Sequence, residues 1–520
     1  MKRTLLVLLG CALFAIKAHT QTATKFIDAN NIRAKITNAG PLFWDGVDAV
    51  FAVPKTGAKG TVFAAAPWIG GMHNGQLHLM AETYRQSGRD LQQGPVASVY
   101  SANHLTYWDR IWSVSKSNLD AFKAAVQLGQ IPDATTYRDI YEWPARGNVI
   151  GGDTSRAYAP FVDANNDRMY EPLDGDYPAI KGDQCMYVIM NDDIHTHTES
   201  TGKPMKIEIH RMVYAYNTPA VLSNSLFVDY SVINKSAVTY DSLLFSSFVD
   251  FDLGNYIDDY VGTDTSRNMI YAFNGDAIDD GVTGYGAMPP AQACVMLNHK
   301  LASSMYYNNT FAPVTGNPAV AADFYNFMHG KWKNGTAKHA GDSGFASSAP
   351  VTVFSYGGDP CGNTGWWEGS AGIQPGDRRI IGTLEPTTLA PEQSLNVTMA
   401  FVYARATSGD NIASMCALKG AVDSVTTWYK SGGGTTGIID NKPEPLTFLM
   451  YPNPAKQLVT IEGAELKNAA VVVYDITGKQ LKSISMQQSE TISVSDLQAG
   501  LYFVRVTSEK GTATKRLIIE

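Results

Sequence analysis

The chain has 520 residues and a formal net charge of −8 at pH 7. This acidic balance argues against nucleic acid or an anionic membrane surface as the main partner, because both repel a negatively charged protein. Only 17% of the residues are charged while 11% are aromatic. That mix is typical of β-rich secreted proteins and not of helical cytosolic enzymes.

The first 20 residues predict a secretory signal peptide. Two cations precede an apolar run from Leu5 to Ile16, which is too short to cross a bilayer but suits a signal peptide cleaved after Thr20. The alternative, lipoprotein processing at Cys11, would leave a short apolar segment before the cysteine. No later segment has the apolar length of a membrane helix, so we expect no transmembrane segment in the mature chain.

Two-residue periodicity dominates the body of the chain, residues 21–430. Alternating or continuously apolar segments of strand length lie at 206–216, 225–234, 242–253 and 394–406. Helical spacing is rare: one capped helix is expected near Ser117 and another over 411–430. The sequence therefore predicts a mainly β body, a large β-sandwich or jelly-roll-like fold with few helices. It is either one composite body or two closely packed parts dividing near residue 200.

The chain changes character after residue 430. Residues 431–446 contain three consecutive glycines and two prolines, which predicts a linker. Residues 447–520 alternate regularly between turn signals, which predicts a small C-terminal Ig-like β-sandwich.

The C-terminal segment resembles a known family. The match rests on Tyr451-Pro452-Asn453-Pro454, Asp475 with Gly478, and Leu497, Gly500 and Tyr502. These residues, within about 446–520, are similar to the type A C-terminal sorting domain of the Bacteroidota type IX secretion system. One departure is the final Glu520, where relatives often end in a basic residue.

This resemblance implies a route and a location. The signal peptide would bring the chain to the periplasm, and the type IX machinery would pass it through the outer membrane. The destination is the extracellular space or the outer-membrane surface. In the family the sorting domain is usually removed, and many cargoes are then attached to surface lipopolysaccharide.

The body resembles other proteins less usefully. Blocks such as "DANNDRMYEPLDGDYPAIKGDQ" and "GDRRIIGTLEPTTLAPEQSLNVTMAFVYAR", spanning about 160–406, are similar to large secreted Bacteroidota proteins with the same tail. That group has no activity that the resemblance could carry over to this chain.

The stretch "DANNDRMYEPLD", residues 163–174, predicts a calcium site. Oxygen ligands fall at the EF-hand positions 1, 3, 5, 7, 9 and 12 of the loop; they come from Asp163, Asn165, Asp167, the Met169 carbonyl, Glu171 and Asp174. An Asp at position 12 is similar to the loops of dockerin domains. The departure is Arg168 at position 6, where glycine normally makes the sharp turn. A merely solvated acidic turn is the alternative.

A second acidic cluster follows a predicted strand. Asp250 and Asp252 share one face of the strand end, and three further carboxylates are expected in the loop after it: Asp258, Asp259 and Asp264. Five carboxylates so close repel one another unless a cation neutralises them or water screens them. Calcium, a solvated loop and a glycosidase-like carboxylate pair all remain open here.

A histidine-rich segment offers the alternative of an enzyme. His195 and His197 share one face of an extended segment, and Glu208 and His210 share a face of the next. If the two segments pair, the four side chains could bind Zn²⁺ in a secreted metal-dependent hydrolase. A polar, solvent-facing hairpin is the other interpretation.

Four cysteines remain after cleavage: Cys185, Cys294, Cys361 and Cys416. Their spacing fits no compact zinc motif. Disulfides, with three possible connectivities, and small buried hydrophobic residues both remain open.

Two functions are therefore carried forward. The first is a calcium-stabilised surface protein that binds glycans or matrix, with Trp68, Trp366 and Trp367 as candidate contact residues. The second is the metal-dependent hydrolase that uses His195, His197 and His210. We favour the first, because the chain lacks the common catalytic motifs.

Overall fold

The computed structural model describes residues 23–520 except 39, 45–49, 58, 85–87, 151–152, 155–157, 195, 346–347, 434–447, 464–465, 467, 476–478, 488 and 509–510. The predicted signal peptide, residues 1–20, and most of the predicted linker therefore lie outside the described residues. So do His195 and Gly478.

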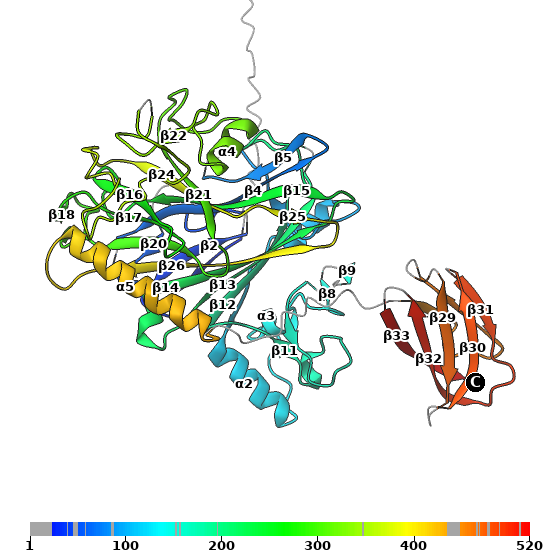
Figure 1. The fold of residues 1–520 in the computed structure, drawn as a ribbon. Coiled ribbons are helices and arrows are strands. Elements are labelled where there is room, and N and C mark those ends of the chain that lie inside the picture. The colour runs from blue at the N-terminus through cyan, green and yellow to red at the C-terminus, as the bar shows by residue number, and fades with distance from the viewer. Residues whose placement is uncertain are drawn as a thin grey trace, which may run out of the picture. The chain divides into compact units, whose positions relative to one another are not determined.

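The chain forms two compact units, Met1–Ile438 and Ile439–Glu520. Figure 1 shows both of them. The first unit is one compact body, as in the first of the two predicted arrangements. Both of its main sheets combine strands from before and after residue 200, and hydrogen-bonded pairing across that point makes the body one unit.

The larger sheet has nine strands among the described residues and is antiparallel. In spatial order the strands are β16 (Asp259–Asp264), β17 (Met269–Asn274), β20 (Ala291–Met296), β26 (Ser394–Ala404), β14 (Ser225–Asn234), β13 (Ile207–Ala215), β12 (Gln184–Asn191) and β6 (Gln92–Gln93), with β7 (Trp112–Ser115) also paired to β12.

The second sheet has six strands in the part of the chain that the structure describes. They are β21 (Leu301–Asn308), β24 (Arg378–Leu384), β15 (Tyr240–Phe251), β4 (Val62–His73) and β5 (Gln76–Ala81), with β25 (Thr387–Leu389) also paired to β15. One apolar core takes buried residues from both sheets, for example Val228 from β14 and Val249 from β15. The predicted mainly β fold is confirmed.

A second core covers the other face of the larger sheet. It includes Phe227 of β14 and Val402 of β26, which pack with Leu418 and Val422 of α5 (Asn411–Lys430). In Figure 1 this helix runs along the lower side of the body. The body is thus layered as sheet, sheet and an outer layer that contains helices.

The predicted helices are present with shifted ends. α5 has the predicted bounds, whereas α2 (Lys116–Gln127) begins earlier than expected because Ser115, and not Ser117, accepts the capping hydrogen bond from the Asn118 N–H. Three short helices were not predicted from the sequence: α1 (Ala102–Trp108), α3 (Arg138–Tyr141) and α4 (Ala321–Met328).

Small ladders and 3₁₀ turns complete the described part of the body. They are β1 (Thr24–Ile27), β2 (Arg33–Thr37) and β3 (Phe51–Ala52); the pairs β8 (Val149–Ile150) with β9 (Asp153–Thr154), β10 (Phe161–Val162) with β11 (Tyr177–Pro178), β18 (Ile278–Asp279) with β19 (Gly286–Ala287), and β22 (Lys338–His339) with β23 (Val351–Thr352); and the turns η1 (Pro172–Asp174) and η2 (Ala220–Leu222).

Both interpretations of the cysteines are realised. Cys361 and Cys416 form a disulfide that ties the 361 loop to α5. Cys185 and Cys294 are buried free thiols, and burial raises the pKa of each to about 12.

The C-terminal unit has its own core. Its described strands form a three-stranded and a four-stranded sheet, which fits the predicted sandwich. They are β27 (Leu449–Tyr451), β28 (Leu458–Glu462), β29 (Ala469–Tyr474), β30 (Gln480–Met486), β31 (Ser489–Ser493), β32 (Gly500–Ser508) and β33 (Gly511–Ile519). None of the helices described in either unit is both long and apolar enough to cross a membrane.

Candidate metal centre

Three carboxylates meet where β15 ends and β24 begins. Asp250 on β15 is the direct cross-strand partner of Arg379 on β24. Asp252 and Asp377 each lie two residues from one member of that pair, and side chains two residues apart in extended chain share a face. The antiparallel register therefore brings four charged side chains together from two segments that are far apart in sequence.

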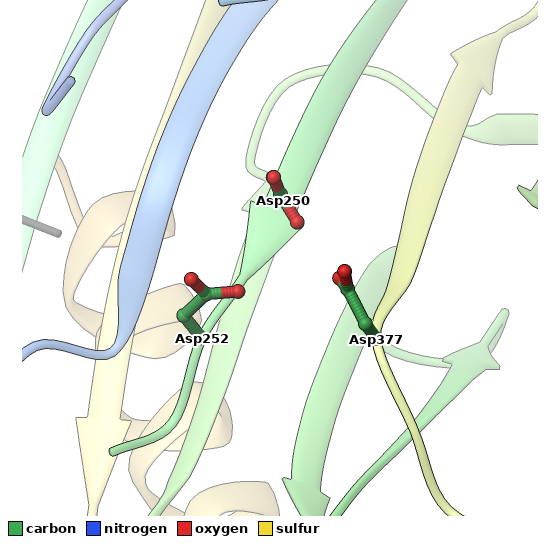
Figure 2. A group of neighbouring side chains, drawn as sticks. All are labelled: Asp250, Asp252 and Asp377. Carbon is green, nitrogen blue, oxygen red and sulfur yellow. The ribbon is translucent and has the colours of Figure 1, made fainter. Parts of the chain in front are cut away.

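The carboxylates of Asp250, Asp252 and Asp377 point toward one another (Figure 2). Each offers an oxygen, and these oxygens all lie within 4.8 Å of one another. Asp250 is fully buried, while the other two are half-buried. Groups of Asp, Glu, His or Cys side chains close enough to hold a metal ion together were sought among the described residues, and this group of three is the one found.

Arg379 provides the positive charge beside these carboxylates. Its Nη2 lies 2.8 Å from Asp250 Oδ2, and its Nη1 pairs with Asp377. The guanidinium also donates to the Tyr84 hydroxyl. Asp377 accepts a further hydrogen bond, 3.1 Å long, from the Asn309 side-chain amide.

Among the described residues, three buried oxygens of the group have no partner in hydrogen-bond geometry: Oδ1 and Oδ2 of Asp250 and Oδ1 of Asp252. Of these, Oδ2 of Asp250 has the ion pair with Arg379. Buried carboxylate oxygens are normally paired, because leaving them without a partner has a desolvation penalty. A bound cation would supply the missing partners of such oxygens.

Electrostatics agrees with this geometry. Burial raises the pKa of Asp250 well above its ordinary value, against the opposing effect of Arg379. Burial likewise raises the pKa of Asp252 to about 7. With all groups ionised, three carboxylates and one guanidinium leave two uncompensated negative charges, which one divalent cation would neutralise. An all-oxygen set suits a hard cation such as Ca²⁺ and not Zn²⁺.

The sequence placed Asp258, Asp259 and Asp264 in a loop with this pair, and the structure corrects that placement. Asp259 and Asp264 are the first and last residues of β16, because the segment pairs with β17. Asp264 forms an ion pair with Arg267 at 2.8 Å. Among the described residues, the third carboxylate beside Asp250 and Asp252 belongs to Asp377. The sequence did not predict this residue.

Asp258 and Asp259 lie in a neighbouring acidic region. Asp259 Oδ2 accepts from the Leu253 N–H, while its Oδ1 is buried without a partner. Burial raises the pKa of Asp259 well above its ordinary value, and the nearby Asp258 adds to the effect.

The predicted calcium loop lies between two paired strands, as expected: β10 ends at Val162 and β11 begins at Tyr177. Asp163 accepts from the N–H groups of Asp167 and Arg168, at 3.2 and 2.8 Å. Its carboxylate is therefore turned into the loop, where position 1 of a calcium loop belongs.

Arg168 reaches the conformation that glycine normally provides at position 6. Its φ is +67°, in the left-handed region that non-glycine residues seldom adopt. Asp167, the nearest charge, raises the pKa of Glu171 above its ordinary value, with a smaller contribution from Asp174. The loop thus has the backbone turn and the crowded carboxylates of a calcium site.

The structure does not bring the predicted zinc ligands together. Both ring nitrogens of His197 lie against carbonyl oxygens, Nδ1 at 2.8 Å from Leu79 O and Nε2 at 2.9 Å from Asp192 O. Both nitrogens are therefore occupied by main-chain carbonyl oxygens, and neither faces space for a metal. The His197 side chain is buried, with carboxylate oxygens of Asp90 and Asp192 at 3.6 and 3.8 Å.

His210 has a different partner from His197. Its Nε2 lies 2.8 Å from Glu208 Oε1. In the described part of the chain, these two residues and His197 do not form a three-ligand group. The fourth predicted ligand, His195, lies outside the described residues. The zinc hypothesis required these side chains to meet at one point, and the described ones do not.

The tryptophans are less exposed than the binding hypothesis expected. Trp68 is fully buried in β4 and its Nε1 donates to Glu82 O, so its proposed role as a contact residue is wrong. Trp366 and Trp367 are half-buried. Trp366 packs on Tyr356 with ring centroids 4.7 Å apart.

Comparison with known proteins assigns the C-terminal unit. Residues 449–520 match the family described as secretion system C-terminal sorting domain. The chain is a type IX secretion cargo. The sorting domain accounts for the second compact unit and directs export to the cell surface or the extracellular space.

The comparisons carry no argument about the activity of the body. No curated protein matches the chain. Among solved structures, a polysaccharide lyase is similar over 60% of this chain and 34% of its own, with 8% sequence identity and a TM-score of 0.20. At that level of similarity, nothing about the activity of the body follows from the lyase.

Proposed function

We propose that the exported body is a calcium-stabilised β protein that binds glycans or matrix outside the cell. Export by the sorting domain places it at the cell surface or in the extracellular space, where calcium modules typically bind with Kd of about 10⁻⁴–10⁻³ M. The observation that carries the calcium part is the group formed by Asp250, Asp252 and Asp377, whose carboxylates converge within 4.8 Å while buried oxygens of Asp250 and Asp252 lack hydrogen-bond partners among the described residues.

Charge and ligand type favour calcium over a catalytic metal. The group supplies carboxylate oxygens and no nitrogen or sulfur, the ligand set that hard cations prefer. A bound Ca²⁺ would neutralise the two excess negative charges and fill the space between β15 and β24. It would therefore fasten the two central strands of the smaller sheet at the end where their pairing stops.

The loop at 163–174 is proposed as a second calcium site. Its Asp163 and Asp167 carboxylates are held toward the loop interior by backbone N–H groups. Calcium would replace these hydrogen bonds with coordination, because a cation near 2.4 Å from several oxygens interacts more strongly than a single N–H donor. The binding function itself rests on the secreted, β-rich character of the body.

The test is calcium-dependent stability combined with metal analysis. At about ten times Kd, one site that binds only the native state contributes about 1.4 kcal/mol. The melting temperature of the wild-type chain should rise from EDTA to millimolar calcium. Asp252→Asn should remove the part of this rise that comes from the site at Asp250. Asp241→Asn should not, because Asp241 is an exposed residue at the opposite end of β15 from the site.

Two results would contradict the proposal. One is a wild-type melting temperature that does not respond to chelation. The other is stoichiometric zinc in the purified chain, which would favour the alternative of a metal-dependent hydrolase.

A further inference from the structure

A hollow lies beside α5, lined by this helix, the β16–β17 hairpin and the loop 357–360. Its volume is about 310 Å³, which is near the lower end of the range for small-molecule sites, about 300–1,000 Å³. Thr265, Ser266 and Gly357 line the hollow and are exposed, so it opens to solvent. We call it the α5 pocket.

The turn of the β16–β17 hairpin forms one wall of the α5 pocket. Asp264, the last residue of β16, accepts from the Ser266 N–H at 3.0 Å and from the Ser266 hydroxyl at 2.6 Å. Its other carboxylate oxygen lies 2.8 Å from Arg267 Nη1. The carboxylate therefore closes the turn and also holds the Arg267 guanidinium beside it.

The loop 357–360 forms another wall and is tied to α5 twice. Lys419 Nζ on the helix lies 2.8 Å from Asp359 Oδ1, which also accepts from the Cys361 N–H at 2.9 Å. The Cys361–Cys416 disulfide adds a covalent link next to this ion pair. The walls are thus fixed before a ligand arrives, which reduces the entropic cost of binding.

Tyr271 of β17 contributes a buried hydroxyl group to the lining of the α5 pocket. Only 1% of the residue is exposed, and its hydroxyl has no hydrogen-bond partner among the described residues. Tyr271 is the direct cross-strand partner of Gly262, and a Cβ at Gly262 would lie 2.4 Å from the hydroxyl oxygen. The glycine therefore leaves the room that the hydroxyl occupies.

The carboxylates of the α5 pocket lie close to this hydroxyl. Burial raises the pKa of Tyr271, and Asp264 and Asp359 raise it further. Both of these residues line the pocket. Because buried hydroxyl groups are normally hydrogen-bonded, a ligand in the pocket would supply the partner that Tyr271 lacks.

The charges that line the α5 pocket occur in pairs, and each pair sets an acceptor beside a donor. They are Lys419 with Asp359 and Arg267 with Asp264. A ligand group with a full charge would be attracted by one member of a pair and repelled by the other. Two adjacent hydroxyl groups of a sugar ring match a pair, because one donates to the carboxylate while the other accepts from the cation.

A zwitterion such as a free amino acid has both charges and is the competing ligand class. Lys419 and Asp359 already neutralise each other at 2.8 Å, so a zwitterion would bind only by separating them. Hydroxyl groups bind with the pair intact. The ammonium group has three donors, and Asp359 is its ion-pair partner among the described residues, so donors remain for a ligand.

We propose that the α5 pocket binds one sugar unit of a neutral glycan. One sugar hydroxyl would bond to the Tyr271 hydroxyl, and two adjacent ones to Lys419 and Asp359. This inference rests on the proposed binding function and gives it a location and a ligand class. The pocket shares no lining residue with the proposed calcium sites.

The experiment measures binding of the calcium-loaded full chain to an array of neutral polysaccharides, acidic polysaccharides, collagen and fibronectin. The wild type should bind at least one neutral polysaccharide, and free amino acids should not compete. Tyr271→Phe/Lys419→Met should weaken that binding about tenfold or more, because one neutral and one charged hydrogen bond are lost. The matched control Tyr107→Phe/Lys430→Met changes exposed residues of the same types on α1 and α5 and should leave binding unchanged.

Folding of each variant is checked by its melting temperature. Tyr271→Phe keeps the buried ring and removes a hydroxyl without a described partner, so it should leave the melting temperature unchanged. If the double variant fails to fold, this single variant provides the test and should weaken binding about fivefold.

The outcomes separate the α5 pocket from the proposed function. Polysaccharide binding that survives in the folded variants would overturn the pocket and leave the proposed function standing. Binding confined to acidic polysaccharides, to collagen or to fibronectin would do the same, as would competition by amino acids, because each contradicts the ligand class. A wild-type chain that binds nothing on the array would overturn both.

Discussion

Asp250 and Arg379 are both a cross-strand backbone pair and a buried ion pair, with Asp250 Oδ2 2.8 Å from Arg379 Nη2. One guanidinium thus faces three carboxylates at the end of two central strands. Removing Arg379 should show how much stability its positive charge contributes. It should also show how much of that contribution a bound cation can restore.

Arg379→Met should strongly destabilise the chain in EDTA. Removing one partner of a buried ion pair typically costs about 3–5 kcal/mol, because the remaining charge is buried without compensation. Saturating calcium should recover part of that loss, since the cation would then face three carboxylates without a competing guanidinium. Chemical denaturation with and without calcium measures both quantities. A calcium response no larger than that of the wild type would count against the site.

Without calcium, stability should fall as the pH rises toward neutrality. Burial raises the pKa of Asp252 from 3.8 to about 7. Because the folded pKa is the higher one, the stabilisation from this group is complete below about pH 4 and is lost as the pH rises through 7. Melting temperatures between pH 4 and 8 in EDTA should show the decline.

Saturating calcium should reduce this decline, because it binds the ionised carboxylate. A calcium-independent part should remain from buried carboxyls outside the site, such as Glu368 and Asp259, whose pKa values burial also raises. Asp252→Asn should show a smaller difference between the profiles with and without calcium than the wild type. Identical pH profiles with and without calcium would contradict the assignment.

The loop at 163–174 should become resistant to trypsin when calcium is bound. Arg168 is exposed at the tip of the loop and is a trypsin site. Coordination by the surrounding oxygens would hold the backbone in place and slow cleavage there. Asp167→Ala should abolish this protection, and Asp241→Ala should retain it. Mass spectrometry of timed digests identifies the peptide bond that is cleaved. Equal cleavage rates in calcium and in EDTA would show that the loop is only an acidic turn.

Deleting residues from about 440 onward should leave the body in the periplasm. The deletion removes the sorting domain at 449–520 that the type IX system requires. Cell fractionation and surface labelling measure where the truncated chain resides. A fusion of residues 440–520 to a periplasmic reporter is the complementary control and should reach the surface. Normal surface levels of the truncated body would refute the assignment.

Loss of the Cys361–Cys416 disulfide should lower the free energy of unfolding by about 2–4 kcal/mol, because the bond closes a loop between residues 55 apart. Urea denaturation of Cys361→Ser/Cys416→Ser measures the effect. Dithiothreitol should destabilise the wild type but not this variant. If the variant is as stable as the wild type, the loop is held by packing alone.

Much of the fold was predictable because its cause is local. The segments that became β13, β14, β15 and β26 alternate or run apolar at strand length, and they appear within two residues of the expected ends. The 411–430 helix keeps helical spacing of Met415, Leu418 and Val422, all buried in the structure. Trp68 was misjudged, although it lies in a continuous apolar run, the pattern of a strand buried on both faces.

The site was only half predictable. The spacing of Asp250 and Asp252 placed both on one face, as two-residue periodicity requires. Asp377 could not be found this way, because it joins them through the pairing of β15 with β24, a long-range contact that no local pattern encodes. The surroundings of His197 likewise depend on a long-range contact, because one of the carbonyl oxygens at its ring belongs to Leu79.

Among the described residues, the apolar cores of the body and of the sorting domain have no residue in common. Each core is complete within its own unit, so cutting the chain between the units should leave both cores intact and buried. The same independence makes the export signal transferable. Substitutions that change what the body binds need not disturb its route out of the cell, so cargo and signal can evolve separately.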